Sequence, residues 1–393
     1  MGEWKEHELG KIVDVRDGTH DSPKEKSEGK YLITSRHIKN GKIDLSKAYK
    51  ISFEDFEQVN KRSKVDKWDI LFSMIGTVGE IALIDFEPDF AIKNIGLLKT
   101  GDENLAKWII YYLKSTEAQN EIFASLKGST QQYITLGDLR KFPILLPPLP
   151  EQKAIASVLS SLDDKIDLLH RENKTLEAMA ETLFRQWFVE EASEWWEEKP
   201  LSFFGEIICG KTPSKKIEEY FGGDIPFIKI PDMYGNTFVF ETSDSLTEKG
   251  KNSQNNKTLP PRSICVSCIA TVGLVSMTTK ESQTNQQINS IIPKKVFYRY
   301  YLYLFMKNFS ELLIAMASGG TATLNLNTGD FSKIEVVLPD ENILKNFHNI
   351  VEPIFEKIFE NQRQIRTLEK LRDTLLPKLM SGEVRVTLTE EKA

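Results

Sequence analysis

One glycine-rich stretch has the residue types of a phosphate-binding loop. Residues 205–212 read Gly-Glu-Ile-Ile-Cys-Gly-Lys-Thr, which matches the spacing of glycines, Lys and Thr in nucleotide-binding loops. That chemistry needs a strand before the loop and a helix that begins at the Lys-Thr pair, so that backbone N–H groups face the phosphates. Here Pro213 follows at once, no strand is expected around Pro200, and residues 206–209 themselves favour a strand. An enzyme that holds a nucleotide with Lys211 is therefore the weakest alternative.

The three cysteines, Cys209, Cys265 and Cys268, offer neither a metal centre nor a disulfide framework. Residues 265–268 form a single CxxC pair, whereas a zinc site needs four ligands. The five histidines are scattered. No serine lies in a nucleophile elbow, and the Asp/Asn-Pro-Pro-aromatic sequence of amino-methyltransferases does not occur. We therefore interpret residues 265–268 as an apolar strand and expect no catalytic residue and no metal.

A long amphipathic helix is the element that must organise the remaining candidate residues. Residues 161–188 have a heptad seam with alternating spacings of 4 and 3, formed by Leu162, Ile166, Leu169, Asn173, Leu176, Ala180, Leu183 and Trp187. Ser161 and Asp164 resemble an N-terminal capping box, and Pro150 is expected to open a separate short helix over 149–162. The long helix would span about 40 Å, and its single apolar stripe requires a partner.

The chain contains a second copy of this helix 192 residues later. The shifted seam reads Ile354, Ile358, Asn361, Ile365, Leu368, Arg372, Leu375 and Leu379. Pro353 is expected to start this helix. A parallel pair would set each seam asparagine against an apolar side chain, whereas an antiparallel pair brings Asn173 and Asn361 into one layer. Because a polar pair fixes register, we predict an antiparallel coiled coil with an Asn173–Asn361 contact.

The segments between the helices repeat as well. LGKIVDV (9–15) matches FGEIICG (204–210), and IGTVGEIALID (75–85) matches IATVGLVSMTT (269–279). Gly79 and Gly273 are expected to supply tight strand connections. Short strands are expected at residues 11–15, 30–35, 69–75, 80–85 and 94–99, and one helix over 105–126. We predict an α+β chain with a first domain at 1–150, a central helical region at 151–192, a second, similar domain at 193–340 and a C-terminal helical region at 341–393.

Composition is ordinary for a soluble globular protein, with 40% hydrophobic and 27% charged residues. No apolar run approaches the roughly 18 residues of a membrane span, and the N-terminus lacks a signal-peptide core, so we expect a cytoplasmic protein. The net charge of −6 is concentrated in residues 151–200. The two large segments are nearly neutral and can carry local basic faces.

Four stretches together resemble the specificity (S) subunits of type I restriction–modification systems. They are DGTHDSP (17–23), the segment 148–188 that begins PLPEQKAIASVL, GKTPSKKIEEYFGGDIPFIKIPDM (210–233) and LRDTLLPKLMSGEV (371–384). The resemblance covers nearly the whole chain. It implies two target-recognition domains, each reading one half of a split double-stranded DNA sequence, and two helices that set the spacing.

The resemblance also implies a division of labour. The S subunit is not catalytic and binds no cofactor. It assembles with two methyltransferase (M) subunits that use S-adenosylmethionine, and with restriction (R) subunits that use ATP and magnesium. The absence of methyltransferase and helicase motifs agrees with this division. A helical ruler of about 40 Å also suits two readers one duplex turn, about 34–36 Å, apart.

Polar residues in loops are the candidate base readers, because sequence is read by hydrogen bonds to base edges. In the first domain these are Thr19, His20, Arg36, His37, Lys39, Asn40, Ser73, Thr130, Gln131 and Gln132. In the second domain they are Lys211, Thr212, Ser214, Lys215, Lys216, Lys229, Asn285, Gln286, Gln287 and Thr321. Turn chemistry or a solvated surface is the alternative interpretation of each residue.

The helical regions are the expected docking site of the M subunit. Its candidate contacts are the apolar Phe184, Trp187 and Phe188 and the acidic Asp163, Asp164 and Asp167. Packing of Trp187 against the chain's own domain is an equal alternative. The alternative function is a two-lobed helical scaffold that binds proteins without DNA. Salt-dependent binding to duplex DNA distinguishes the two functions.

Overall fold

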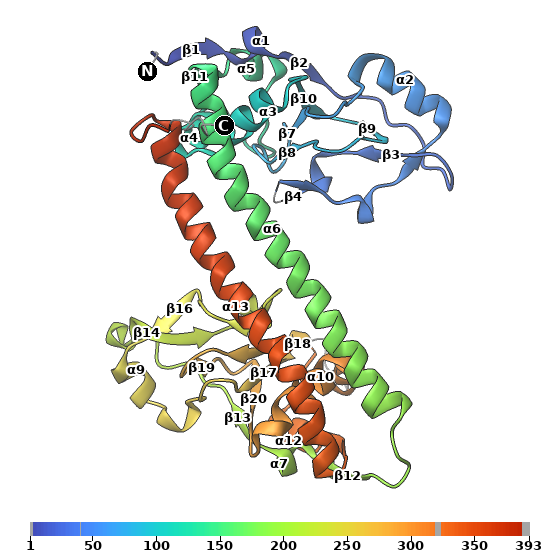
Figure 1. Cartoon of the computed structure of the whole chain (residues 1–393), viewed down its shortest axis with the longest axis vertical. Coiled ribbons are helices and arrows are strands. Elements are labelled where there is room, and N and C mark those ends of the chain that lie inside the picture. Colours follow the sequence, from blue (N-terminus) through green and yellow to red (C-terminus); the bar gives the residue numbers. More distant parts are fainter. Residues whose placement is uncertain (1–2, 40, 319–323, 387–393) are drawn as a thin grey trace, which may run out of the picture. The chain divides into compact units, whose positions relative to one another are not determined.

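A computed structural model describes residues 3–39, 41–318 and 324–386 (Figure 1). The chain divides into two compact units, which are Met1–Lys165 with Leu368–Ala393 (unit 1) and Ile166–Thr367 (unit 2). Each unit combines small sheets with short helices and includes segments of two long helices, α6 (Leu149–Arg185) and α13 (Glu341–Met380). This is the predicted α+β class. The domain boundaries at residues 150, 192 and 340 stay predictions.

An antiparallel four-stranded sheet lies at the centre of unit 1. Its order is β2 (Asp14–Asp17), β10 (Ile95–Lys99), β7 (Ile70–Ser73) and β8 (Ile81–Leu83). Successive side chains of β7 point to opposite faces. Ile70 and Phe72 pack with Trp108 of α3 (Glu103–Lys114), whereas Leu71 packs with Ile92 on the other face. The sheet is therefore buried on both faces and provides a rigid scaffold for the loops at its edges.

The helical segment of unit 1 that follows the sheet is broken in two. Ser115 ends α3, and its hydroxyl accepts a hydrogen bond from the backbone N–H of Ala118 (3.2 Å), which caps α4 (Thr116–Ala124). The predicted single helix over 105–126 is therefore wrong. Serine competes for backbone groups and favours caps over helix interiors, and this preference overrides the apolar periodicity here.

A second, smaller sheet in unit 1 has the order β6 (Lys50–Ile51), β3 (Lys30–Ile33) and β9 (Phe90–Ile92), with β3 and β9 parallel. Helix α2 (Phe53–Ser63) packs beside it through Val59. A short 3₁₀ turn, η1 (Ser35–His37), follows β3 and leads into the hairpin of β4 (Ile38–Lys39) and β5 (Lys42–Ile43). The remaining elements are β1 (Lys5–Glu8), α1 (Leu9–Ile12), η2 (Leu45–Lys47), α5 (Leu136–Lys141) and β11 (Pro143–Leu146).

Unit 2 repeats this topology. Its larger sheet has the order β13 (Gly205–Cys209), β20 (Ile288–Pro293), β17 (Ile264–Ile269), β18 (Thr271–Thr278) and β15 (Phe238–Val239). Its smaller sheet has the order β16 (Asp244–Leu246), β14 (Phe221–Ile228) and β19 (Gln283–Thr284), and β14 and β19 are again parallel. Strands β13, β20, β17 and β18 thus correspond to β2, β10, β7 and β8, so the sequence repeat is a structural repeat.

The remaining elements of unit 2 are mostly short. They are η3 (Gln186–Glu190), β12 (Glu197–Pro200), α7 (Leu201–Phe204), η4 (Glu218–Tyr220), α8 (Ile230–Met233), α9 (Glu248–Asn252), η5 (Asn255–Lys257), η6 (Val296–Tyr298), α10 (Arg299–Asn308), α11 (Ser310–Ala317), α12 (Thr328–Ser332) and β21 (Glu335–Leu338). Strand β12 pairs with β21, which corrects the expectation of no strand around Pro200.

The two stretches that suggested enzyme chemistry are ordinary parts of the sheet. Glu206–Cys209 lies within strand β13, and the next element after Lys211 is η4, so no helix begins at the Lys-Thr pair. Cys265 and Cys268 lie in the buried strand β17, and burial raises the pKa of Cys265 to about 12 and that of Cys268 to about 11. Such thiols stay protonated and unreactive, which agrees with the interpretation as an apolar strand.

The two long helices begin earlier than predicted. Helix α6 is continuous from Leu149, so Ser161 is not a cap; its hydroxyl donates to the carbonyl of Val158 (2.8 Å), as serine inside a helix does. Helix α13 begins at Glu341 and runs through Pro353, which lies inside the helix and does not start it. Among the described residues, no helix is long and apolar enough to cross a bilayer.

Within unit 2 the two helices pair antiparallel. The Asn361 amide donates to Asn173 Oδ1 (3.0 Å) and to Glu172 Oε2 (3.0 Å), and both asparagines are buried. Further along α6, Phe184 meets Phe347, with ring centroids 6.4 Å apart, so numbers rise on one helix as they fall on the other. The predicted Asn173–Asn361 contact is therefore present. In unit 1 the corresponding segments are joined by the ion pair of Arg372 and Asp163 (3.0 Å).

Candidate nucleic-acid interface

A glycine turn follows the first strand of the main sheet in unit 1. The backbone N–H of Gly18 donates to the carbonyl of Ile95 (2.8 Å), and that of Thr19 donates to Ile92 (3.0 Å). A Cβ atom at Gly18 would lie 2.5 Å from the Ile92 carbonyl oxygen, so only glycine allows this approach without a shift of the backbone. The turn therefore holds Thr19 and His20 against the loop that enters β10.

Unit 2 builds the same turn after β13. The N–H of Gly210 donates to Ile288 (3.0 Å), and that of Lys211 donates to Thr284 (2.9 Å). A Cβ atom at Gly210 would lie 2.1 Å from the carbonyl oxygen of Asn285. Thr19 and Lys211 therefore occupy equivalent positions on one scaffold.

The residue after each of these two, His20 in unit 1 and Thr212 in unit 2, makes a side-chain hydrogen bond to the neighbouring loop, but the bonding groups differ. In unit 1, His20 Nδ1 lies 2.8 Å from Asn94 Oδ1, and its Nε2 lies 2.9 Å from Asp17, which also accepts from Arg62. In unit 2, the Thr212 hydroxyl donates to Gln286 Oε1 (2.8 Å). The backbone is thus kept while the exposed polar groups differ.

A second pair of equivalent turns follows the central strands of the smaller sheets. In unit 1 the N–H of Thr34 donates to His37 Nδ1 (2.9 Å), which closes η1. In unit 2 the N–H of Lys229 donates to Asp232 Oδ2 (2.8 Å), which closes α8. A side-chain acceptor for the N-cap N–H satisfies one of the unpaired donors at a helix start.

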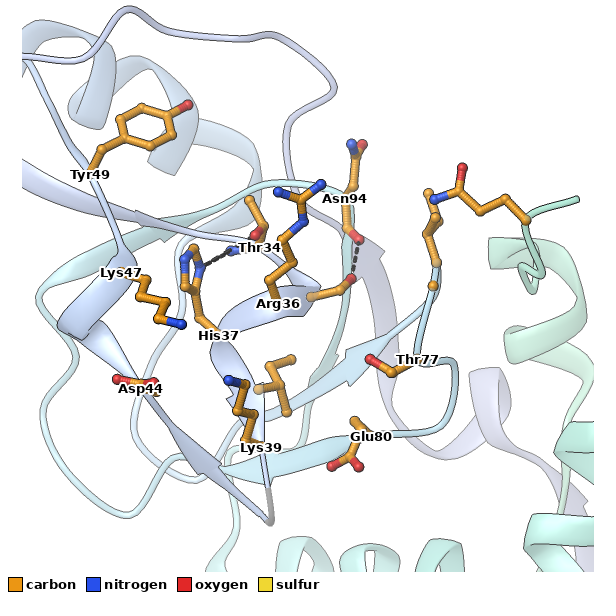
Figure 2. A pocket seen from close by; sticks show the side chains of 15 residues that line it. Thr34, Arg36, His37, Lys39, Asp44, Lys47, Tyr49, Thr77, Glu80 and Asn94 are labelled. Atoms are coloured by element: carbon orange, nitrogen blue, oxygen red, sulfur yellow. Dashed lines mark hydrogen bonds between the residues drawn. The ribbon is translucent and has the colours of Figure 1, made fainter. Parts of the chain in front are cut away.

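The turn in unit 1 borders a pocket of about 880 Å³ (Figure 2). Four of the predicted readers line it, Arg36, His37, Lys39 and Gln131, together with Asn94, Lys47 and Thr77, which the sequence analysis missed. Asn94 has a positive φ of 53°. Asparagine tolerates this conformation better than most residues. An Asn at the start of an expected strand could therefore have indicated a turn at this position. Thr130 and Gln132 are exposed on the same loop as Gln131.

His37 is also buried but lines the pocket; two further predicted base readers are buried away from it, and these two predictions are corrected. Ser73 is fully buried in β7, and its hydroxyl donates to the carbonyl of Ile75 (3.4 Å). Asn285 is 7% exposed, and its side chain bonds to the N–H and Oε1 of Gln287 (3.1 and 2.9 Å). Polar loop composition suggested exposure, but both side chains satisfy nearby backbone or amide groups. Asn40 and Thr321 lie outside the described residues.

The other predicted readers of unit 2 lie on its surface. Lys211, Ser214, Lys215 and Lys216 are exposed between β13 and η4, and Gln286 is exposed at the neighbouring turn. The Lys229 ammonium pairs with Asp244 (2.7 Å), so its charge is already partly neutralised. The lysine-rich segment 211–216 is therefore the part of unit 2 that we expect to contact the sugar–phosphate backbone of a nucleic acid.

Comparison with known proteins identifies the family. The model for the type I restriction modification DNA specificity domain matches the chain twice, over residues 1–178 and 193–370. The chain belongs to this type I DNA specificity family. It is 33% identical, over 98% of its length and 100% of the relative's, to the type I restriction enzyme HindI specificity subunit of Haemophilus influenzae. It is 29% identical, over 70% of its length and 69% of the relative's, to the MjaIX specificity subunit of Methanocaldococcus jannaschii.

A solved structure has the same fold. The crystal structure of the type I restriction–modification S subunit from M. genitalium matches with a TM-score of 0.62 at 20% identity, and the match covers 98% of this chain and 97% of that one. The predicted resemblance is thus confirmed. This specificity subunit is the DNA-recognition component of a type I restriction–modification system and not its catalytic component.

The aromatic residues predicted to bind the M subunit are core residues of the specificity subunit. Phe184 and Phe188 are 1% and 7% exposed, and the Phe188 ring packs 4.7 Å from Tyr301 and 4.8 Å from Phe347. Their prediction as partner contacts is corrected, because helix α6 needs them to bury its end in unit 2. Trp187 is half-buried and packs 5.8 Å from Phe347, which agrees with its alternative interpretation.

The acidic candidates on α6 differ in their surroundings. Asp163 pairs with Arg372 and accepts from the Tyr111 hydroxyl (3.0 Å). Burial, together with the nearby Asp163 charge, raises the pKa of Tyr111 well above its usual range. Asp164 is exposed, and Asp167 pairs with Arg171 (3.3 Å). Asp163 thus has a structural role already, whereas Asp164 has no hydrogen bond or ion pair among the described residues.

Proposed function

We propose that the specificity subunit reads a split duplex sequence, one half-site with each unit. The observation that carries this proposal is the repeated pair of turns. Both units hold them with the same backbone hydrogen bonds, at Gly18 and Gly210, while the side chains that follow differ. A common backbone with different polar groups suits two readers that approach DNA alike and select different bases.

Positively charged loops would supply the sequence-independent part of the affinity. Lys211, Lys215 and Lys216 are exposed beside the turn of unit 2, and Lys39 and Lys47 border the pocket of unit 1. Each lysine that neutralises a phosphate releases counterions, so binding should weaken steeply with salt.

We further propose that this chain works in the cytoplasm with two M subunits and with R subunits. The M subunits would use S-adenosylmethionine and the R subunits ATP and magnesium, while this chain holds none of them. Among the described residues, no group of three or more His, Cys, Asp or Glu is placed to hold a metal ion. Asp164 and Asp167 on α6 remain candidate M-subunit contacts.

Domain exchange tests the proposal. Residues 1–150 are replaced by those of a homologue with another target, the chain is co-expressed with its methyltransferase, and methylated sites are mapped by sequencing. We expect one half-site to change and the other to persist. The matched control replaces residues 193–340 and should change the other half-site. If both half-sites changed together, or neither did, the one-unit-per-half-site proposal would be wrong.

A further inference from the structure

We propose that the pocket beside η1 reads one guanine of the first half-site and that Arg36 is the residue that specifies it. This inference rests on the proposed function and adds the base and its reader. The pocket, about 880 Å³, lies within the size range of ligand sites, so the edge of a base has room to enter. Figure 2 shows the side chains of Arg36 and Asn94 pointing in the same direction.

The backbone holds Arg36 in place. Thr34 before it is bonded to His37 after it, and the Ser35 hydroxyl donates to the carbonyl of Asn94 (3.4 Å). The side chain of Arg36 is exposed, and in the described part of the chain no hydrogen bond or ion pair engages its guanidinium. A fixed backbone with a free guanidinium is the arrangement that a base-reading arginine needs.

His37 provides a second donor in the same pocket. Its Nδ1 accepts from the Thr34 N–H, so the ring proton is on Nε2. The residue is only 7% exposed, and within residues 3–39, 41–318 and 324–386 nothing is bonded to Nε2. Because His37 lines the pocket, this donor is available to an acceptor that enters the pocket.

Asn94 adds donors on the other side of Arg36. Its Oδ1 faces His20 Nδ1 (2.8 Å), which leaves both amide hydrogens on Nδ2 unpaired among the described residues. The carboxylates that line the pocket are Asp44 and Glu80, and Asp44 accepts from the N–H of Ser46 (2.9 Å). Glu80 is a free acceptor, since its carboxylate has no hydrogen bond or ion pair among the described residues, but the donors of Arg36, His37, Asn94, Lys39 and Lys47 outnumber it.

A donor-rich pocket matches guanine. The major-groove edge of guanine presents two acceptors, N7 and O6, whereas adenine presents one acceptor and one donor and cytosine presents a donor. Arginine bonded to both guanine acceptors is the commonest specific contact. The equivalent turn of unit 2 has Pro231 and Asp232 in place of Arg36 and His37. Recognition of a guanine by this turn is therefore expected only in the first half-site.

The test uses the full chain co-expressed with its methyltransferase. For Arg36→Ala, sequencing of methylated sites should show that one required guanine of the first half-site becomes degenerate. We expect discrimination there to fall roughly tenfold to a hundredfold, with every other position and the second half-site unchanged. Lys24→Ala is the matched control, because it removes one exposed positive charge that does not line the pocket, and it should leave the recognised sequence intact.

Two other outcomes would overturn the inference. A uniform loss of affinity for all sequences, with the salt slope reduced by about one, would make Arg36 a phosphate contact, and an unchanged sequence preference would remove it from recognition. A second measurement needs no variant: 7-deazaguanine, placed at each guanine in turn, should weaken binding of the unaltered protein most at the Arg36 position. If the unaltered protein, co-expressed with its methyltransferase, directs methylation to no split target, the proposed function fails instead.

Discussion

The turn at η1 in unit 1 and the turn at α8 in unit 2 have the same backbone hydrogen bond but different side chains. His37 in unit 1 and Asp232 in unit 2 accept the same backbone N–H, but one is an imidazole and the other a carboxylate. Beside them, Arg36 of unit 1 is replaced by Pro231. Backbone hydrogen bonds and close approaches therefore constrain the scaffold, while the side chains at these positions differ between the units, as the proposed reading of two different half-sites requires.

Alanine at the two turn glycines is expected to have the largest effect on stability. A Cβ at Gly210 would meet the Asn285 carbonyl oxygen at 2.1 Å and the buried Thr284 hydroxyl at 2.2 Å, whereas at Gly18 the nearest atom lies at 2.5 Å. We expect Gly210→Ala to destabilise unit 2 by about 3 kcal/mol and Gly18→Ala to destabilise unit 1 by about 1–2 kcal/mol. Urea unfolding measures both changes.

A matched glycine in a helix provides the control. Gly137 lies in α5, and the nearest atom to its added Cβ would be 3.7 Å away, an ordinary contact. Gly137→Ala should be neutral or stabilise by about 0.5–1 kcal/mol. If all three substitutions had the same effect, close approach would not be what holds the turns.

The sequence predicted the scaffold better than the interface. The heptad seam and the repeat determined the antiparallel helices and the Asn173–Asn361 contact, because such patterns repeat over many residues and tolerate local error. The sequence did not correctly predict which single residues cap a helix. Ser115 splits a helix that apolar periodicity made continuous, whereas Ser161 caps nothing.

Interface residues were harder to predict because exposure is a tertiary property. Ser73 and Ser35 have the same side chain, but Ser73 lies inside a sheet that is covered on both faces, while Ser35 lies in the turn beside the pocket. Asn94 was missed because a strand was expected to begin there, and its positive φ became visible only in the fold. Periodicity gives the face of a strand but not the loops that later cover that face.

The polar residue pairs between the two long helices differ in the two units. Unit 1 uses the half-buried ion pair Asp163–Arg372, and unit 2 the buried pair Asn173–Asn361. Replacing both asparagines by leucine should raise the melting temperature by a few degrees, because an apolar layer removes the cost of two buried amides, while loosening the register. Calorimetry measures the first effect, and the spread of spacer lengths among methylated sites measures the second.

A single leucine in either polar layer should destabilise the protein, in contrast to the double variant. Asn361→Leu leaves the Asn173 amide buried without its partner, so it should destabilise by about 1–3 kcal/mol. Arg372→Leu, at the half-buried layer of unit 1, should cost less. A double leucine variant that melted lower, or that kept a single spacer length, would contradict a register role for the asparagines.

The smallest expected effect concerns pH and one helix position. His348 on α13 is buried in unit 2, and the equivalent position of α6 in unit 1 is Ala156. The imidazole stacks on Tyr300 with centroids 5.2 Å apart. Burial lowers the pKa of His348 below its ordinary 6.5; the nearby Arg299 charge adds to this, and Glu352 opposes it.

A lowered pKa in the folded state sets the sign of the pH effect. The stability that His348 contributes is full above the unfolded pKa of 6.5 and is lost as the pH falls from there through the lower folded-state pKa, because protonation then favours the unfolded chain. Unit 2 should therefore lose more stability than unit 1 between about pH 7.5 and about pH 5.5. His348→Ala lowers stability at both pH values through its cavity, but it should flatten this difference. His170→Ala, at an exposed site on α6, should leave the difference unchanged; an equal flattening there would show that His348 is not the group that titrates.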